Sequence, residues 1–242
     1  MHFLVEKLLP FFLPSQCACC GRFLDEGQKG LCSCCLSNIR RIRPPYCSIC
    51  GTPFASETAG DHPCGPCVLR RRYFTMARAV GYYEGPLQEA IHRWKYEGKI
   101  HLTPFFGKWM AEELFHYWDA DIPDLLVPVP LHVQRLRERG FNQALLLVRE
   151  LGRHTGIPCP KRILRKKTAT VPQVHLSGSE RERGVRGAFE VFGKGRVEGK
   201  SILLVDDVFT TGATVNECAR VLVAAGAQRV DVFTLAHAVR NS

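Results

Sequence analysis

The segment from residue 201 to residue 214 limits the fold of this chain more than any other. Its first five residues, Ser-Ile-Leu-Leu-Val, form an apolar run of the kind found in parallel strands that are buried on both faces. Two adjacent carboxylates, Asp206 and Asp207, follow, and a short hydroxyl-rich loop then leads into a helical pattern. A loop that enters a helix presents unpaired backbone N–H groups and the positive end of the helix dipole. The segment therefore predicts a buried strand that delivers an anion-binding loop.

The residue types of this loop suit a phosphorylated sugar. Gly212 lets the backbone approach a ligand closely, and Thr210, Thr211 and Thr214 add hydroxyl donors. Two acids just before a phosphate-binding loop would repel the ligand unless they face something else. Ribose hydroxyls with a nearby Mg²⁺ would satisfy them. The alternative is a buried strand followed by a solvated acidic turn.

A second segment offers the donors that a pyrophosphate group needs. The run Val127-Pro-Val-Pro130 predicts a strand that ends in a proline-stiffened turn, which Leu131 and His132 continue. Arg135 and Arg139 stand at i and i+4, so on a helix they would share one face and fork onto phosphate oxygens. The alternative is a solvated basic turn.

After about residue 72, apolar patterns of strand and helix type alternate. We expect strands at 77–83, 124–129, 201–205 and 230–235, and helices from 85, at 103–118, at 142–154 and at 214–225. This alternation implies βαβ units and a mostly parallel sheet. Residues 161–200 hold no convincing element, which suggests a functional loop or flap.

The flap is strongly basic. Residues 161–196 contain ten Lys or Arg against three acids, and the run Arg165-Lys166-Lys167 lies near its start. A mobile loop here would close over pyrophosphate and exclude water. The alternatives are a track for single-stranded nucleic acid and a solvated surface loop. The formal net charge of +10 favours anionic partners, without choosing among phosphorylated metabolites, nucleic acid and an acidic membrane surface.

The cysteines are concentrated at the other end of the chain. Ten of the twelve lie between residues 17 and 67, and eight form pairs with two residues between them: Cys17/Cys20, Cys32/Cys35, Cys47/Cys50 and Cys64/Cys67. Such thiolate pairs suit tetrahedral zinc, and two pairs fill one closed structural site. Pairing in sequence order predicts two zinc ions. Cross-braced pairing is the alternative, and Cys19, Cys34 and His62 are competing ligands.

The sequence of the N-terminus indicates where in the cell the protein is expected. Its single apolar stretch is interrupted by Glu6, Lys7 and Pro10, and no small-residue cleavage site follows. We expect a short helix over residues 3–13 that docks on the protein, with contact to a membrane or a partner as the alternative. We therefore predict a cytoplasmic protein with reduced thiols, and the inner face of the membrane is the alternative location.

Two of these segments resemble known families. Residues 202–214 resemble the signature with which type I phosphoribosyltransferases bind 5-phosphoribosyl-1-pyrophosphate (PRPP). The pattern VPVPLHxxRxxxRGFNQA at 127–144 resembles the corresponding segment of the ComF family of competence-associated, phosphoribosyltransferase-like proteins. The Trp94-Lys95-Tyr96-x-Gly98 segment and parts of the flap agree with the same family, and so does the cysteine-rich start.

The resemblance implies a type I phosphoribosyltransferase fold at residues 73–242 behind a double zinc-ribbon domain at residues 1–72. The roles that it implies are a catalytic pair that contacts the ribose hydroxyls (Asp206, Asp207), a 5′-phosphate loop (Thr210, Thr211, Gly212, Ala213, Thr214), a pyrophosphate site (Leu131, His132, Arg135, Arg139) and a flap (Arg165, Lys166, Lys167). The cofactors would be Mg²⁺ with PRPP and two structural zinc ions.

The resemblance also implies a role in DNA uptake during natural transformation, with single-stranded DNA as a ligand and a helicase as a partner. One alternative is a metabolic phosphoribosyltransferase that transfers ribose 5-phosphate from PRPP to a base or amine. Another is a zinc-ribbon adaptor with a vestigial sugar-phosphate site. The sequence shows no recognisable hood for a purine, pyrimidine or amine, so turnover is not part of the prediction.

Overall fold

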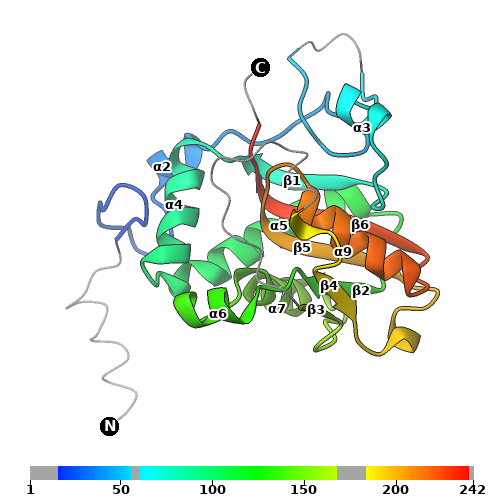
Figure 1. Cartoon of the computed structure of the whole chain (residues 1–242). Helices are drawn as coiled ribbons and strands as arrows, with labels where there is room; N and C mark the ends of the chain where they lie inside the picture. The colour runs from blue at the N-terminus through cyan, green and yellow to red at the C-terminus, as the bar shows by residue number, and fades with distance from the viewer. Residues whose placement is uncertain (1–15, 56–59, 168–183, 240–242) are drawn as a thin grey trace.

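The computed structural model describes residues 16–55, 60–167 and 184–239 (Figure 1). Its centre is a four-stranded sheet of β1 (Ala77–Tyr82), β2 (Leu125–Pro128), β5 (Ser201–Phe209) and β6 (Arg229–His237). The strand order is β1-β6-β5-β2, and all neighbours are parallel. The expected parallel α/β architecture is therefore confirmed. The helix expected over residues 3–13 lies outside the described residues.

Helices cover both faces of this sheet. One face packs against α5 (Thr103–Trp118) and α7 (Gln143–Thr155), with α4 (Gly85–Tyr96) beside them. The other face packs against α9 (Ala213–Ala224), which lies across β5 and β6 in Figure 1. Side chains of β5 alternate between the two cores: Leu203 and Val205 face the first, and Ile202 and Leu204 face the second. This double burial explains why β5 reads as a continuous apolar run.

Helix α7 shows how the local sequence sets the ends of an element. Asn142 caps its start by accepting a hydrogen bond from the Leu145 backbone, and Gly156 ends it in the left-handed region at φ 74°. Leu147, Val148 and Leu151 form its buried stripe. The helix expected at 142–154 is observed one residue later, and the one expected at 103–118 has the expected bounds.

The segment expected to lack regular structure contains a small second sheet. Its strands β3 (Leu164–Lys166) and β4 (Phe189–Val191) are antiparallel, and the short helix η3 (Lys194–Arg196) follows. Strands of three residues carry too few side chains to show a two-residue period, so the expectation of no element here was wrong. Helix α6 (Val133–Arg139), between β2 and α7, is also short, with seven residues.

The cysteine-rich region lies against the sheet and its helices. It contains α2 (Ser33–Ser37) and α3 (Gly65–Leu69), and its backbone joins β1 directly: Ala77 N donates to Ile49 O (2.6 Å) and Tyr82 N donates to Arg40 O (2.9 Å). Cysteines of this region are buried in the two hydrophobic cores that lie on the two faces of the sheet. A domain boundary near residue 72 stays a prediction.

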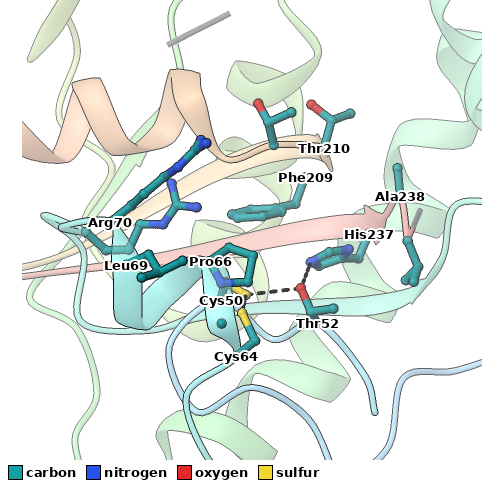
Figure 2. Close-up of a pocket in the computed structure, with 14 residues that line it drawn as sticks. Cys50, Thr52, Cys64, Pro66, Leu69, Arg70, Phe209, Thr210, His237 and Ala238 are labelled. Atoms are coloured by element: carbon teal, nitrogen blue, oxygen red, sulfur yellow. Dashed lines mark hydrogen bonds between the residues drawn. The ribbon is translucent and has the colours of Figure 1, made fainter. Parts of the chain in front are cut away.

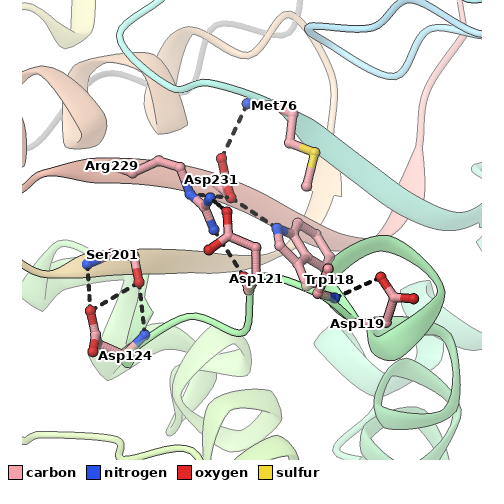
Figure 3. A network of polar contacts seen from close by, with 9 residues as sticks. Met76, Trp118, Asp119, Asp121, Asp124, Ser201, Arg229 and Asp231 are labelled. Carbon is pink, nitrogen blue, oxygen red and sulfur yellow. Dashed lines mark hydrogen bonds and ion pairs between the residues drawn. The ribbon is translucent and has the colours of Figure 1, made fainter.

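A buried polar network closes the amino end of the sheet (Figure 3). Asp231 on β6 is almost fully buried, and its carboxylate accepts hydrogen bonds from Trp118 Nε1 (2.8 Å) and Met76 N (3.3 Å). Arg229 forms an ion pair with the same carboxylate at 3.1 Å. These contacts tie α5 and β1 to β6 at the end opposite Asp206 and Asp207. Within the described ranges, none of the helices is long and apolar enough to span a membrane.

Candidate functional site

Asp206 and Asp207 lie near the carboxyl end of β5, where they have different surroundings. Successive side chains of a strand point to opposite faces. Asp207 forms an ion pair with Lys95 Nζ of α4 at 2.8 Å, whereas Asp206 accepts a hydrogen bond from Asp207 N at 2.9 Å. Burial, together with the charge of Asp207, raises the pKa of Asp206 to about 7. The predicted acids therefore form an asymmetric pair, in which Asp207 alone forms an ion pair within the part of the chain that the structure describes.

The loop after β5 has the predicted strand–loop–helix geometry. Thr210 is exposed, and Thr211 Oγ1 accepts a hydrogen bond from Ala213 N at 3.4 Å. Gly212 caps α9 in the left-handed region at φ 75°. A Cβ added to Gly212 would lie 2.6 Å from Cζ of Phe209. The glycine is thus required by backbone conformation and by the Phe209 ring, in addition to any approach of a ligand.

The two predicted arginines lie on one face of α6. Arg135 and Arg139 are half-buried, while the residues between them are largely exposed. Arg139 donates to Tyr96 Oη at 2.9 Å and to Gln143 Oε1 at 3.3 Å. Its charge also contributes to lowering the pKa of Asp206, after the larger effects of burial and of Asp207, which raise it. Arg135 and Arg139 therefore share one face of α6, as their i, i+4 spacing predicts, and their binding of phosphate oxygens stays a prediction.

Leu131 and His132 contribute differently. His132 is the N-cap of α6, and its Nδ1 accepts a hydrogen bond from Gln134 N at 3.3 Å. This contact positions the start of the helix that carries Arg135 and Arg139. Leu131 is a half-buried apolar side chain just before that cap. In the structure these two residues support the basic face of α6.

The flap triplet is divided between two sides of β3. Arg165 and Lys167 both form ion pairs with Glu190 of β4, the latter at 2.9 Å. Lys166 points the other way, and its ammonium lies 5.6 Å from the centre of the Phe189 ring. Burial lowers the pKa of Lys166, and the charges of Arg135 and Asp206 act on it as well. Lys166 therefore differs from Arg165 and Lys167, since its ammonium lies on the side of Phe189 and interacts with the charge of Asp206.

Lys95 belongs to the same group of charges, although sequence reasoning gave it no role. It is held by the rigid helix α4, in which the adjacent Trp94 is fully buried and donates from Nε1 to Thr103 Oγ1 at 3.0 Å. The only sequence signal for Lys95 is the resemblance of the Trp94-Lys95-Tyr96 segment to the ComF family. Its chemical meaning required the fold, because Lys95 and Asp207 are far apart in sequence.

The cysteines assemble into two tetrads. The sulfur atoms of Cys17, Cys20, Cys32 and Cys35 lie within 4.8 Å of one another, and so do those of Cys47, Cys50, Cys64 and Cys67. This is the grouping that pairing in sequence order predicts, and cross-braced pairing is excluded. Among the described residues, neither cluster includes Cys19, Cys34 or His62. The His62 ring instead stacks on Phe54 at 4.2 Å.

The electrostatics of each tetrad fit a divalent cation. Burial opposes ionisation of Cys17, but N–H groups of Cys20, Cys32 and Cys19 outweigh it and lower its pKa to about 6. The same balance lowers the pKa of Cys47 to about 7, whereas burial and the neighbouring thiols raise the pKa of Cys64 to about 11. Four close thiols cannot all ionise without a compensating charge. Zinc would supply that charge in a closed tetrahedral site.

Comparison with known proteins agrees with both halves of this description. The double zinc ribbon domain family matches residues 8–68, and the phosphoribosyl transferase domain family matches residues 140–241. Competence protein F of Haemophilus influenzae is 30% identical over 231 residues, which cover 94% of this chain and 99% of that protein. DNA utilization protein YhgH of Escherichia coli is 32% identical over 226 residues, covering 92% and 97%. The chain belongs to the competence protein F family.

Membership extends over nearly the whole chain. Competence protein ComFC of Bacillus subtilis is 31% identical over 225 residues, which cover 88% of this chain and 86% of that protein. The zinc-ribbon match contains both cysteine tetrads, and the phosphoribosyl transferase match contains β5, its loop and the flap. That second match begins after Arg135 and Arg139, so it does not include these two arginines.

Proposed function

We propose that this member of the competence protein F family binds PRPP with Mg²⁺ at the carboxyl end of β5 and acts in DNA utilisation. The observation that carries the proposal is the convergence of complementary groups. A carboxylate pair stands directly before the loop that enters α9, Asp207 pairs with Lys95 at 2.8 Å, and α6 carries Arg135 and Arg139 on one face. Ligands of open parallel sheets bind at the carboxyl ends of the strands.

Each part of PRPP has a matching group. Backbone N–H groups at the start of α9, with Thr210, Thr211 and Thr214, would hold the 5′-phosphate. Asp206 and Asp207 would accept hydrogen bonds from the ribose hydroxyls. Arg135 and Arg139 would hold the pyrophosphate, with Lys166 approaching from the opposite side. When bound, Mg²⁺ would neutralise charge between the acids and the pyrophosphate oxygens.

Calorimetric titration with PRPP and Mg²⁺ tests this proposal. The double substitution Asp206→Asn with Asp207→Asn should weaken binding about a hundredfold or more, because charge-assisted hydrogen bonds are worth about 1.5–3 kcal/mol each. The matched control is Asp25→Asn with Asp119→Asn, which changes two exposed acids elsewhere. Equal affinities for the two double variants would show that the acid pair is not the ribose site.

The proposed role in DNA utilisation rests on family membership, because two similar members are named for competence and for DNA utilisation. We propose that single-stranded DNA is the nucleic acid bound, which the net charge of +10 supports. Affinity should then fall steeply with salt, because phosphate neutralisation releases counterions. A helicase partner stays a prediction.

A metabolic phosphoribosyltransferase is the second candidate, and one pocket favours it. A cavity of about 540 Å³ adjoins the carboxyl ends of β1 and β6, with Arg40, Phe54, Tyr82 and Tyr83 among its lining residues. It would give an acceptor base or amine room at this end of the sheet, although Asp206 and Asp207 are not among its lining residues. Pyrophosphate release on addition of such an acceptor to the PRPP-bound protein would favour this candidate, and its absence across bases and amines would favour binding without transfer.

A further inference from the structure

A second pocket lies between the second cysteine tetrad and the outside of the phosphate loop (Figure 2). Its volume is about 640 Å³, within the range of sites that enclose small ligands. Cys64, Pro66 and Leu69 line it from the cysteine-rich region, and Phe209 and Thr210 line it from the end of β5. Neither Asp206 nor Asp207 lines it, although it adjoins the proposed PRPP site through Thr210 and Thr211 of the phosphate loop.

The charge of this pocket is one-sided. Its lining includes Arg70 and Arg72, and none of the described lining residues is acidic. His237 also borders the pocket, where its Nε2 lies 3.5 Å from the Thr52 hydroxyl. An anion would therefore be attracted to the arginine side of the pocket, away from Cys50 and Cys64, where a zinc-bound tetrad of four thiolates would carry a net negative charge. The remaining lining is largely apolar, which a bare inorganic anion would not need.

The rim of the pocket extends the apolar wall into solvent. Leu69 is 85% exposed and the preceding Val68 is 70% exposed, directly before the run of three arginines. In Figure 2 Thr210 lies above Phe209, Pro66 and Leu69 lie below the ring, and Arg70 lies beside them. One wall thus offers flat apolar contact and the next offers cations and hydroxyls. A ligand with an unpaired planar ring and an adjoining phosphate matches both.

We propose that this pocket holds one nucleotide of single-stranded DNA, with its base against Pro66 and Leu69 and its phosphate against Arg70. The inference rests on the proposed DNA function and names the place where the strand binds. A base must be unpaired to enter a concave pocket, which excludes a continuous duplex. PRPP fits less well, because the described lining offers its ribose no carboxylate.

Fluorescence anisotropy with a labelled oligothymidine of about 15 nucleotides tests the assignment. The double variant Leu69→Gln with Arg70→Glu changes two exposed side chains, so folding should be preserved. Its control is Ile122→Gln with Lys108→Glu, an equivalent change at exposed positions away from the pocket. We expect the pocket variant to weaken binding about tenfold or more and the control variant by less than about twofold.

Crosslinking supplies a positional readout that does not depend on charge. Irradiation should crosslink oligothymidine that carries 5-iodouracil to the protein. Mass spectrometry should then locate the crosslinks within residues 64–72 or 209–211. Crosslinks found only on α6 or the flap, or equal affinities for the pocket and control variants, would overturn the inference and leave DNA binding itself intact. A parent protein that binds no single-stranded DNA at physiological salt would overturn both the inference and the proposed DNA function.

Discussion

Neighbouring residues of this site have different roles because strand geometry separates them. Asp207 faces α4 and pairs with Lys95, while Asp206 faces the opposite side and has a raised pKa. The triplet Arg165, Lys166 and Lys167 divides in the same way, with Arg165 and Lys167 on Glu190 and the ammonium of Lys166 beside the Phe189 ring. Sequence shows which residue types are adjacent. Which of them share a face follows only once each segment is known to be a strand.

The contrast between Lys166 and Arg165 can be tested directly. Lys166→Gln should weaken binding of PRPP with Mg²⁺ about tenfold or more, because it removes a cation beside the proposed pyrophosphate site. Arg165→Gln removes a cation of the same charge whose partner is Glu190 on the outer surface, so its affinity should change by less than about twofold. Calorimetry on the two variants gives the comparison. Equal losses would mean that the flap acts through its total charge.

At the scale of elements, the chain was most predictable where elements were long and buried. The four strands of the main sheet and helices α4, α5, α7 and α9 carry clear apolar periods, and turn residues mark several of their ends. The strand expected at 201–205 continues to Phe209, because Asp206 and Phe209 still pair with β6. Such pairing with a distant strand leaves no local signal. The contact of Lys95 with Asp207 was unpredictable for the same reason.

The loop between β5 and α9 should be intolerant of a side chain at Gly212. Gly212→Ala places a Cβ in the left-handed region and against the Phe209 ring, so it should lower the free energy of unfolding by about 1–3 kcal/mol. Gly195→Ala is the control, because a Cβ there meets no heavy atom within 4 Å. Its effect should be within about 0.5 kcal/mol. Urea denaturation measures both, and similar values would mean that the loop relaxes freely around the added methyl group.

At the scale of the whole molecule, the two cysteine tetrads are part of the cores that support the sheet. Cys17, Cys32 and Cys35 pack in the same cluster as Trp94 and the other buried residues of α4 and α5. Cys47, Cys50 and Cys67 pack with Phe209 and the side of the sheet that α9 covers. Arg41 and Arg43 also reach the carboxylate of Glu113, which is almost fully buried on α5. The metal sites and the candidate PRPP site are therefore built on shared packing.

Removing zinc should consequently destabilise the α/β part as well as the cysteine-rich region. Elemental analysis should give two zinc ions per chain, and metal-binding free energy contributes to folding free energy where the ligands are folded together. The three tryptophans, Trp94, Trp109 and Trp118, all lie on α4 and α5, so their fluorescence follows unfolding of the α/β part, with a contribution at Trp109 from the contact with Arg41 of the cysteine-rich region. Cys35→Ser should lower the denaturation midpoint seen by tryptophan fluorescence, whereas Cys159→Ser, at an exposed cysteine outside both tetrads, should not. A tryptophan transition unchanged by Cys35→Ser, in a protein that has lost one zinc ion, would mean that the cysteine-rich region unfolds independently of the sheet.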